Sequence, residues 1–221
     1  MIVKANIGDR IAFEILYDFH LLKNSYQILY DSLPDVKKKA EIEMNDTLKK
    51  IDPENYEMES SLYYSNYYSI YEEELPNRIS YSFVMSVFSS VEYNIKKLCE
   101  NIKSQKDLPI QLDALSGKLS ERLNNYLKIF KISIIEPSDL QHINELTMVR
   151  NCIAHNNGSI IEYRKFEKQS ASVKLTRFCK AKKNIEIMDN KLLIQKDFCF
   201  FYLDYFEKMF KRWLIALNYK L

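Results

Sequence analysis

Three residues in the segment VRNCIAHNNG, residues 149–158, have the types and spacing best suited to chemistry: Arg150, Asn151 and His155. A histidine can accept or donate a proton near neutral pH, so it can deprotonate a ribose 2′-hydroxyl or protonate a leaving 5′-oxygen. An arginine fork can hold the non-bridging oxygens of a phosphate while negative charge builds up on them. Asn151 could orient the imidazole or the substrate. The set is therefore suited to cleaving a phosphodiester bond without a metal ion.

Helical spacing predicts how these side chains face. At about 100° per residue, Asn151 and His155 share one face, one turn apart, whereas Arg150 and His155 are separated by about 140°. Unwinding of the helix end, or a second copy of the helix packed across a two-fold axis, would bring the arginine and the histidine together. Two histidines could then act as base and acid. We therefore expect a homodimer with a composite active site.

A structural role for the same residues is the main alternative. A histidine in the last turn of a helix can bond free carbonyl groups and faces the negative end of the helix dipole. Arg150 could pair with Glu145 or with a neighbouring helix. Spacing alone leaves both interpretations open.

Other residues capable of chemistry are less well placed. His142 lies about 220° from His155 on the same helix, so the two cannot share a metal ion, and His20 belongs to a distant amphipathic segment. Cys152 has no evident base on its own face. The four cysteines contain no CxxC pair and lie in apolar patterns, which predicts buried thiols. The sequence has no phosphate-binding glycine loop, serine elbow or zinc-protease motif, so no cofactor and no metal are expected.

Composition predicts a soluble, mainly helical protein. Of the 221 residues 47% are hydrophobic and 28% charged, and only 3 Gly and 5 Pro are available for turns, which favours long helices. No stretch approaches the roughly 20 apolar residues of a membrane span. The N-terminus has no apolar core of signal-peptide length. We therefore expect a cytoplasmic protein with no membrane partner.

Charge is unevenly distributed, although the net charge is only +2. Residues 52–74 contain seven acidic side chains and no basic one, and residues 162–183 contain eight basic side chains against two acidic ones. Such runs are usually solvated faces. The basic run, however, begins shortly after the VRNCIAHNNG segment, where a phosphate backbone would need countercharge. Its members are Arg164, Lys165, Lys168, Lys174, Arg177, Lys180, Lys182 and Lys183.

Hydrophobic periodicity predicts helices over residues 9–33, 35–51, 53–75, 78–103, 118–130, 139–156 and 197–217. Pro34 and Pro76 are expected to end helices, Ser138 to cap the helix that carries the motif, and Gly158 to end it. Residues 185–194 are typical of a short β-hairpin.

Two helices have clear core stripes, and a third carries rows of tyrosine. The stripes are Phe83, Val87, Val91, Ile95 or Asn94, Leu98 and Ile102, and, in the last helix, Phe198, Phe201, Tyr205 or Phe206, Met209, Trp213 and Leu217. The rows, Tyr63, Tyr67 and Tyr71 beside Tyr64 and Tyr68, can stack nucleobases. They more often cover a core or a subunit contact.

The run from Arg150 to His155, RNCIAH, resembles the R-N-x-x-x-H signature of HEPN domains, the all-α module of many bacterial ribonuclease toxins and phage-defence proteins. The setting is similar too, because the motif closes a helix, follows a long amphipathic helix and precedes a hairpin and an apolar final helix. The resemblance covers residues 76–221. It implies a mainly α fold, a HEPN-like helical bundle with a short β-hairpin before the last helix, and leaves residues 1–75 as an N-terminal helical extension.

The resemblance also implies a function. The chain would be a metal-independent endoribonuclease, a toxin or abortive-infection effector, that acts as a homodimer on RNA and leaves 2′,3′-cyclic phosphate ends. Arg150 and His155 would be catalytic and Asn151 would support them. An antitoxin or another defence-system protein would be a partner. Toxins paired with a nucleotidyltransferase antitoxin often carry a tyrosine two residues after the histidine, but Asn157 stands there, so adenylylation at that point is not expected.

A different class of function remains as the alternative. A catalytically silent HEPN-like helical module would bind a partner protein or RNA. Its working surface would be the tyrosine rows and the acidic stretch beside them.

Overall fold

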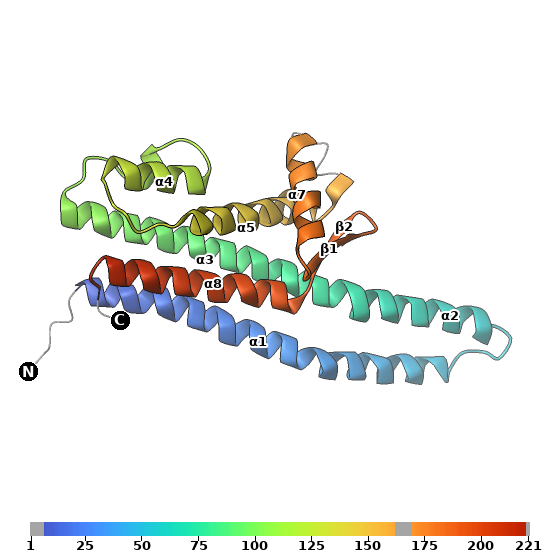
Figure 1. Cartoon of the computed structure of the whole chain (residues 1–221). Coiled ribbons are helices and arrows are strands. Elements are labelled where there is room, and N and C mark those ends of the chain that lie inside the picture. The colour runs from blue at the N-terminus through green and yellow to red at the C-terminus, as the bar shows by residue number, and fades with distance from the viewer. Residues whose placement is uncertain (1–6, 162–168, 220–221) are drawn as a thin grey trace, which may run out of the picture.

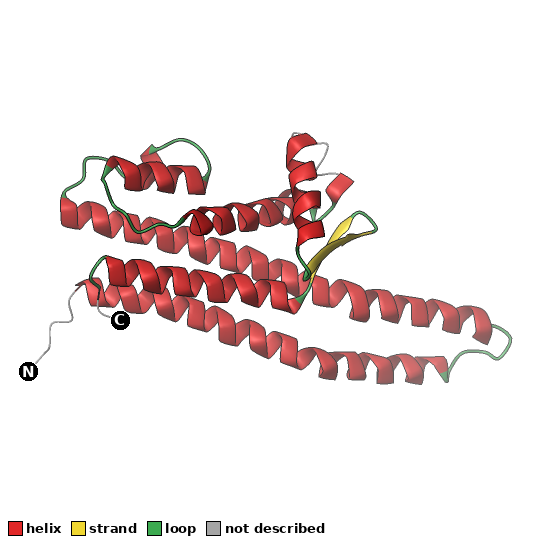
Figure 2. Cartoon of the chain, in the orientation of Figure 1, coloured by secondary structure: helices red, strands yellow, loops and turns green. Residues whose placement is uncertain are grey.

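The computed structural model describes residues 7–161 and 169–219 (Figures 1 and 2). These residues form a mainly helical protein with a two-stranded antiparallel hairpin before the last helix, as the sequence predicts. In chain order the elements are α1 (Ile7–Leu48), α2 (Tyr56–Tyr67), the π-helical turn η1 (Tyr68–Glu74), α3 (Leu75–Lys106), the 3₁₀ turn η2 (Leu112–Ala114), α4 (Leu119–Ile129), α5 (Pro137–Asn156), α7 (Gln169–Ala181), β1 (Ile185–Met188), β2 (Lys191–Ile194) and α8 (Lys196–Ala216). Within these ranges, no helix combines the length and the apolar character needed to cross a membrane.

Two prolines lie inside continuous helical structure instead of ending it. Pro34 is within α1, and Pro76 is in the first turn of α3, directly after η1. A proline within a helix costs about 3 kcal/mol, and the packing of α1 along α2, α3 and α8 outweighs this cost. At Pro76 the wider π-helical turn precedes the ring, and the first turn of an α-helix needs no amide N–H at that position. The predicted helix ends at both prolines are therefore wrong.

The core lies between the long helices α1, α3 and α8, with α8 packed along both of the others (Figure 1). The predicted stripe of α3 is confirmed, since all of its members are buried: Phe83, Val87, Val91, Asn94, Ile95, Leu98 and Ile102. In α8 the prediction is right for Phe198, Phe206, Met209 and Trp213. It is wrong for Phe201, which is 48% exposed and contacts the ring of His142.

The hairpin has the predicted position. Ile185 pairs with Ile194 and Met188 with Lys191. Asp189 and Asn190 make the turn with φ of 48° and 63°, a left-handed conformation that Asp and Asn tolerate better than most residues. Helix α7, which precedes the hairpin, is an element that the hydrophobic pattern did not predict.

Helix α5 begins earlier than predicted. Its N-cap is Glu136 rather than Ser138, and Pro137 occupies the first position. The backbone N–H of Glu136 donates to Oδ2 of Asp139 at 3.0 Å, which is the reciprocal bond of a capping box. A proline suits this position because its missing N–H would have no intrahelical partner.

The N-terminal residues are divided between the core and a projection. The first half of α1 belongs to the common core, where the ring of Phe19 lies 5.4 Å from that of Phe210 and Tyr26 stacks on Phe83 at 4.0 Å. Residues 35–74 form a two-helix arm that extends beyond the bundle (Figure 1). The predicted boundary near residue 75 falls within the helical path that continues from α2 through η1 into α3.

Candidate functional site

Helix α5, which carries the RNCIAH motif, is anchored at its first turn by one buried carboxylate. Asp139 is fully buried and accepts hydrogen bonds from three side chains of α8: Arg212 (Nη2, 2.6 Å), Tyr205 (Oη, 2.9 Å) and Trp213 (Nε1, 3.1 Å). Burial alone would lower the pKa of Arg212, but the hydrogen bond and the charge of Asp139 raise it. These bonds fix where α5 starts relative to α8.

The other end of α5 is closed by two residues with positive φ. Asn157 (φ 48°) is the C-cap and Gly158 (φ 76°) follows it, so the left-handed end begins one residue before the predicted glycine. The N–H of Gly158 donates to the carbonyl of Cys152 at 3.1 Å, and its carbonyl accepts the N–H of Leu192 in β2 at 3.0 Å. A Cβ at this position would lie 1.9 Å from Oη of Tyr81, which itself donates to the carbonyl of Leu192 at 2.6 Å. Glycine therefore lets α3, the hairpin and the end of α5 converge.

Arg150 is partly buried between α5 and α3. Its Cζ lies 5.1 Å from the centroid of the Phe88 ring, and its Nη1 donates to Oδ1 of Asn151 at 2.9 Å. Its Nε is buried with no hydrogen-bond partner, and the guanidinium forms no ion pair in the described ranges. Glu145, the carboxylate considered as its structural partner, is bound instead by Tyr202 at 2.6 Å. A partly desolvated cation without a carboxylate is suited to an anionic ligand.

His155 lies in the last turn of α5 with an exposed side chain. Among the residues that the structure describes, no hydrogen bond joins it to Arg150. Asn151 stands one turn before it, but its Oδ1 accepts from Arg150, so this amide is oriented toward the arginine. A single chain thus holds Arg150 and Asn151 together and presents the imidazole to solvent.

The structure adds Asn156 to the residues of interest at this end of α5, although the sequence did not single it out. Its side chain is only 2% exposed, and neither Oδ1 nor Nδ2 has a hydrogen-bond partner in the described part of the chain. Leaving a buried amide unpaired costs about 1–3 kcal/mol, so such a group in a native structure calls for an explanation. The sequence carried no signal, because an asparagine near a helix end is ordinarily a capping residue.

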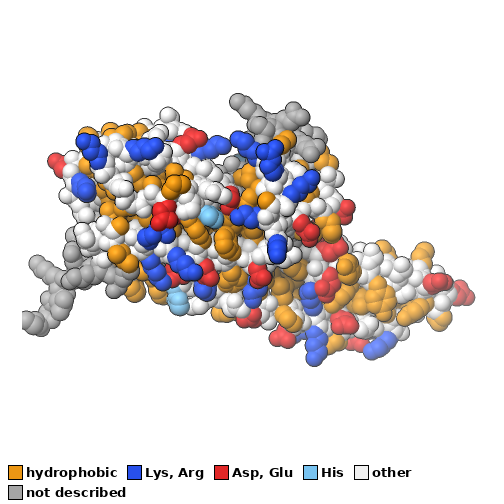
Figure 3. All heavy atoms as spheres, in the orientation of Figure 1, with side chains coloured by type: hydrophobic (Ala, Val, Ile, Leu, Met, Phe, Trp, Pro, Cys, Tyr) orange, Lys and Arg blue, Asp and Glu red, His pale blue; other side chains and the backbone are white. Residues whose placement is uncertain are grey.

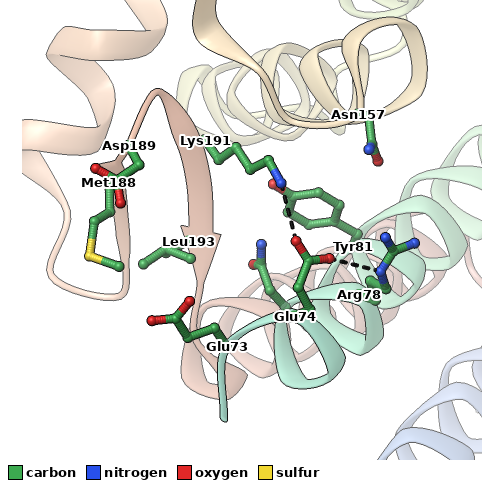
Figure 4. Close-up of a pocket in the computed structure, with 10 residues that line it drawn as sticks. Glu73, Glu74, Arg78, Tyr81, Asn157, Met188, Asp189, Lys191 and Leu193 are labelled. Atoms are coloured by element: carbon green, nitrogen blue, oxygen red, sulfur yellow. Dashed lines mark hydrogen bonds and ion pairs between the residues drawn. The ribbon is translucent and has the colours of Figure 1, made fainter. Parts of the chain in front are cut away.

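A cavity of about 190 Å³ lies beside this end of α5, between α3 and the hairpin (Figure 4). Glu74 bridges its wall, pairing with Lys191 of β2 at 3.1 Å and with Arg78 of α3 at 3.0 Å. Both bonds lower the pKa of Glu74, and the hydrogen bond from Lys191 has the larger effect. Tyr81 and Asn157 line the cavity, whereas the arginine and histidine of the motif do not. The cavity therefore adjoins the end of the motif helix without containing the candidate catalytic pair.

The remaining candidates from the sequence make structural contacts. Nδ1 of His142 lies 2.7 Å from the carbonyl oxygen one turn earlier, and its ring stacks on Tyr205 at 3.9 Å. His20 lies 2.9 Å from the amide nitrogen of Asn24. The four cysteines are buried and unpaired, as predicted, and burial raises the pKa of Cys152 to about 12. A thiol with so high a pKa is a poor nucleophile.

Part of the predicted basic run flanks the site. Arg164, Lys165 and Lys168 lie outside the described residues. Lys174, Arg177 and Lys180 are exposed on α7 at a spacing of three, so they share a face of a helix that contacts α5. Lys182, just beyond α7, pairs with Glu145 at 3.5 Å. No group of three or more His, Cys, Asp or Glu side chains able to hold a metal ion occurs in residues 7–161 and 169–219.

Comparison with known proteins found no match, since no family model, no curated protein and no solved structure is significantly similar to this chain. The candidate site is therefore defined by its own geometry. It consists of a partly buried arginine without a counter-ion, an amide that holds it, and an exposed histidine on the same helix.

Proposed function

We propose that the chain is a metal-independent endoribonuclease of the HEPN type that acts as a homodimer, with a role as a toxin or a phage-defence effector. The main support is that Arg150 is held in place without a counter-ion. Phe88 and Asn151 contact its guanidinium, and no carboxylate in the described ranges neutralises it. Arg122 and Arg212, by contrast, pair with carboxylates at 2.7 and 2.6 Å. An arginine held in place with donors to spare matches the geometry of a phosphate.

In the proposed reaction the imidazole of His155 accepts the proton of a ribose 2′-hydroxyl. The 2′-oxygen bonds to phosphorus, and the bond between phosphorus and the 5′-oxygen breaks. A second His155, from another copy of the chain, donates a proton to the leaving 5′-oxygen. Arg150 stabilises the charge on the non-bridging oxygens, and Asn151 positions Arg150. The products are a 2′,3′-cyclic phosphate and a 5′-hydroxyl.

The geometry of one protomer favours a composite site. His155 is exposed at the helix end, and no described hydrogen bond connects it with Arg150. A second copy packed on this end of α5 would supply the second histidine and close the site against solvent. The exposed basic face of α7, next to α5, would contact the RNA backbone.

Cleavage of RNA by the purified chain in the presence of EDTA tests the proposal. We expect His155→Ala to lower the rate about 10²–10⁴-fold and Arg150→Ala about 10²–10³-fold, with little change in melting temperature. His20→Ala and Arg10→Ala remove the same side chains elsewhere and should cleave like the wild type. Intact RNA with the wild type, or full activity of His155→Ala, would sink the proposal.

Two further readouts separate the proposal from its alternatives. If Arg150 is structural, Arg150→Ala will melt at a much lower temperature and any loss of activity will follow from unfolding. If the chain is a silent binding module, expression of the wild type and expression of Arg150→Ala will have the same effect on growth. Activity that persists in a strictly monomeric sample would contradict the composite site.

A further inference from the structure

The arm carries an apolar surface that the fold of one chain does not use. Of the 12 residues of α2 only Ser60 is buried, whereas a helix of a globular protein normally turns an apolar stripe toward the core. Seven large side chains of α2 and η1 are at least 39% exposed: Tyr56, Met58, Leu62, Tyr63, Tyr64, Tyr68 and Ile70. Figure 3 shows hydrophobic side chains, in orange, gathered along the arm. Large exposed apolar surfaces are typical of interaction sites.

The arm also has a groove at its end. It measures about 790 Å³ and lies where α1 turns into α2. Its lining combines apolar side chains with two tyrosines: Asn45, Leu48, Lys49, Ile51, Pro53, Tyr56 and Tyr64. The ammonium group of Lys49 is already held by Asp46 at 2.8 Å. The groove therefore suits an apolar or aromatic anchor, or the aliphatic stem of a long basic side chain.

The charge of the arm indicates which kind of partner could bind there. Residues 52–74 contain seven carboxylates and no basic side chain. Glu54, Glu57, Glu59 and Glu73 form no ion pair in the described part of the chain. Acidic residues in the first turn of a helix are favoured by its dipole, which accounts for Glu57 and Glu59 but not for the other two. Residues 35–74 together contain eleven acidic and five basic side chains, and all five lysines precede residue 52. The surface that α2 and η1 present is thus acidic, although the α1 side of the arm carries lysines.

We propose that the arm is a docking surface for a protein segment that is both basic and apolar, an amphipathic helix with Lys or Arg beside its apolar anchors. Charge complementarity selects this occupant over two others. RNA phosphates would be repelled by the carboxylates, although tyrosine rings can stack bases. Two arms packed on each other would place like charges together across a two-fold axis. Lysine or arginine over the exposed tyrosine rings would add cation–π attraction.

The position of the arm makes this surface independent of the proposed ribonuclease site. The outer part of α2 lies at the far end of the arm, beyond the hairpin and the end of α5 (Figure 1). A segment docked there leaves Arg150 and His155 uncovered. Binding at the arm and cleavage of RNA can therefore be measured separately.

The test uses the full chain and three fluorescein-labelled probes, followed by anisotropy. The first is an amphipathic helical peptide of Lys, Leu and Trp about five turns long, the second replaces each Lys with Glu, and the third is a single-stranded RNA. We expect the basic peptide to bind, more weakly as salt is raised. Leu62→Ser, and Glu57→Gln with Glu59→Gln, should each weaken binding about fivefold or more. Phe13→Ser, an equally exposed apolar residue on α1 outside the arm, is the matched control.

Three outcomes would contradict the proposal that the arm binds a basic amphipathic segment. The basic and acidic peptides could bind equally well, or the wild type and both arm variants could bind the basic peptide with equal affinity. The third outcome is binding of the RNA that Leu62→Ser abolishes. Self-association that Leu62→Ser abolishes would assign the arm to a second copy instead. Melting curves show whether each variant is folded. An unchanged rate of RNA cleavage by Leu62→Ser distinguishes failure at the arm from failure of the proposed ribonuclease.

Discussion

The guanidinium of Arg150 lies on the ring of Phe88, 5.1 Å from its centroid, and this contact joins the motif helix α5 to α3. Asn151 holds one nitrogen of the same group. The ring supports the cation without neutralising it, because a quadrupole offers no formal charge. Phe88 therefore keeps Arg150 in place and leaves its charge unneutralised.

Replacing Phe88 tests this support. We expect Phe88→Leu to lower the rate of RNA cleavage about two- to thirtyfold, since a cation–π contact contributes about 0.5–2 kcal/mol. Phe83→Leu is the matched control, because Phe83 is buried on the same helix and stacks on Tyr26 instead. Both variants lose stability. Rates measured well below both melting temperatures should fall only for Phe88→Leu, and an equal fall in both would contradict the assignment.

Asn156 offers a test of its unpaired amide. Asn156→Leu replaces a buried group without hydrogen bonds by an apolar one of similar size, so we expect the free energy of unfolding to rise by about 1–3 kcal/mol. Asn94→Leu is the control, because Asn94 is also buried but donates to Asp18 at 2.8 Å. That variant should be destabilised. Urea unfolding of both variants decides the matter, and a loss of stability in Asn156→Leu would mean that its amide is bonded.

Gly158 and Gly117 both have positive φ, but their surroundings differ. An alanine at 158 would place its Cβ 1.9 Å from Oη of Tyr81, whereas at 117 the nearest atom is the carboxylate of Glu121, which can move. Both variants pay for the left-handed backbone. We expect Gly158→Ala to lose about 1–3 kcal/mol more than Gly117→Ala because of overpacking. Thermal unfolding measures the difference, and equal losses would show that Tyr81 yields readily.

Glu145 predicts a pH dependence of stability. Burial would raise the pKa of its carboxyl, but hydrogen bonds from Tyr202 and Gln141 outweigh burial and lower it. A carboxyl with a lowered pKa in the folded state stabilises the protein above its unfolded value of about 4.3. That contribution is lost as the pH falls through the folded pKa. Wild type should therefore exceed Glu145→Gln in stability at pH 7, and the difference should shrink as the pH falls below the unfolded pKa and through the lower folded pKa.

Unfolding by urea at several pH values checks this prediction. Glu100→Gln serves as the control, because Glu100 is exposed and makes no ion pair in the described residues. A difference between wild type and Glu145→Gln that stays constant down to pH 3 would contradict the prediction, because it would show that the stabilisation does not depend on the negative charge of Glu145.

Much of the local structure could be predicted from the sequence. The stripe of α3 and the hairpin at residues 185–194 have the predicted positions, because periodicity and turn residues act on neighbours in the chain. The helical setting of Arg150 and His155 was predictable for the same reason. The continuity of the helices at Pro34 and Pro76 could not be predicted. At Pro34 contacts with distant helices outweigh a local penalty, and at Pro76 a π-helical turn precedes a ring that stands in the first turn of α3.

The sequence by itself determined which residue types stand on the motif helix and that the chain is mainly helical. Only the tertiary structure decided what surrounds them. Phe88 reaches Arg150 from another helix, Asp139 is held by three side chains of α8, and Asn156 is buried without a partner. The physical reason is that side-chain periodicity reports the apolar face of each helix, whereas the partner on that face depends on how helices far apart in the chain pack together.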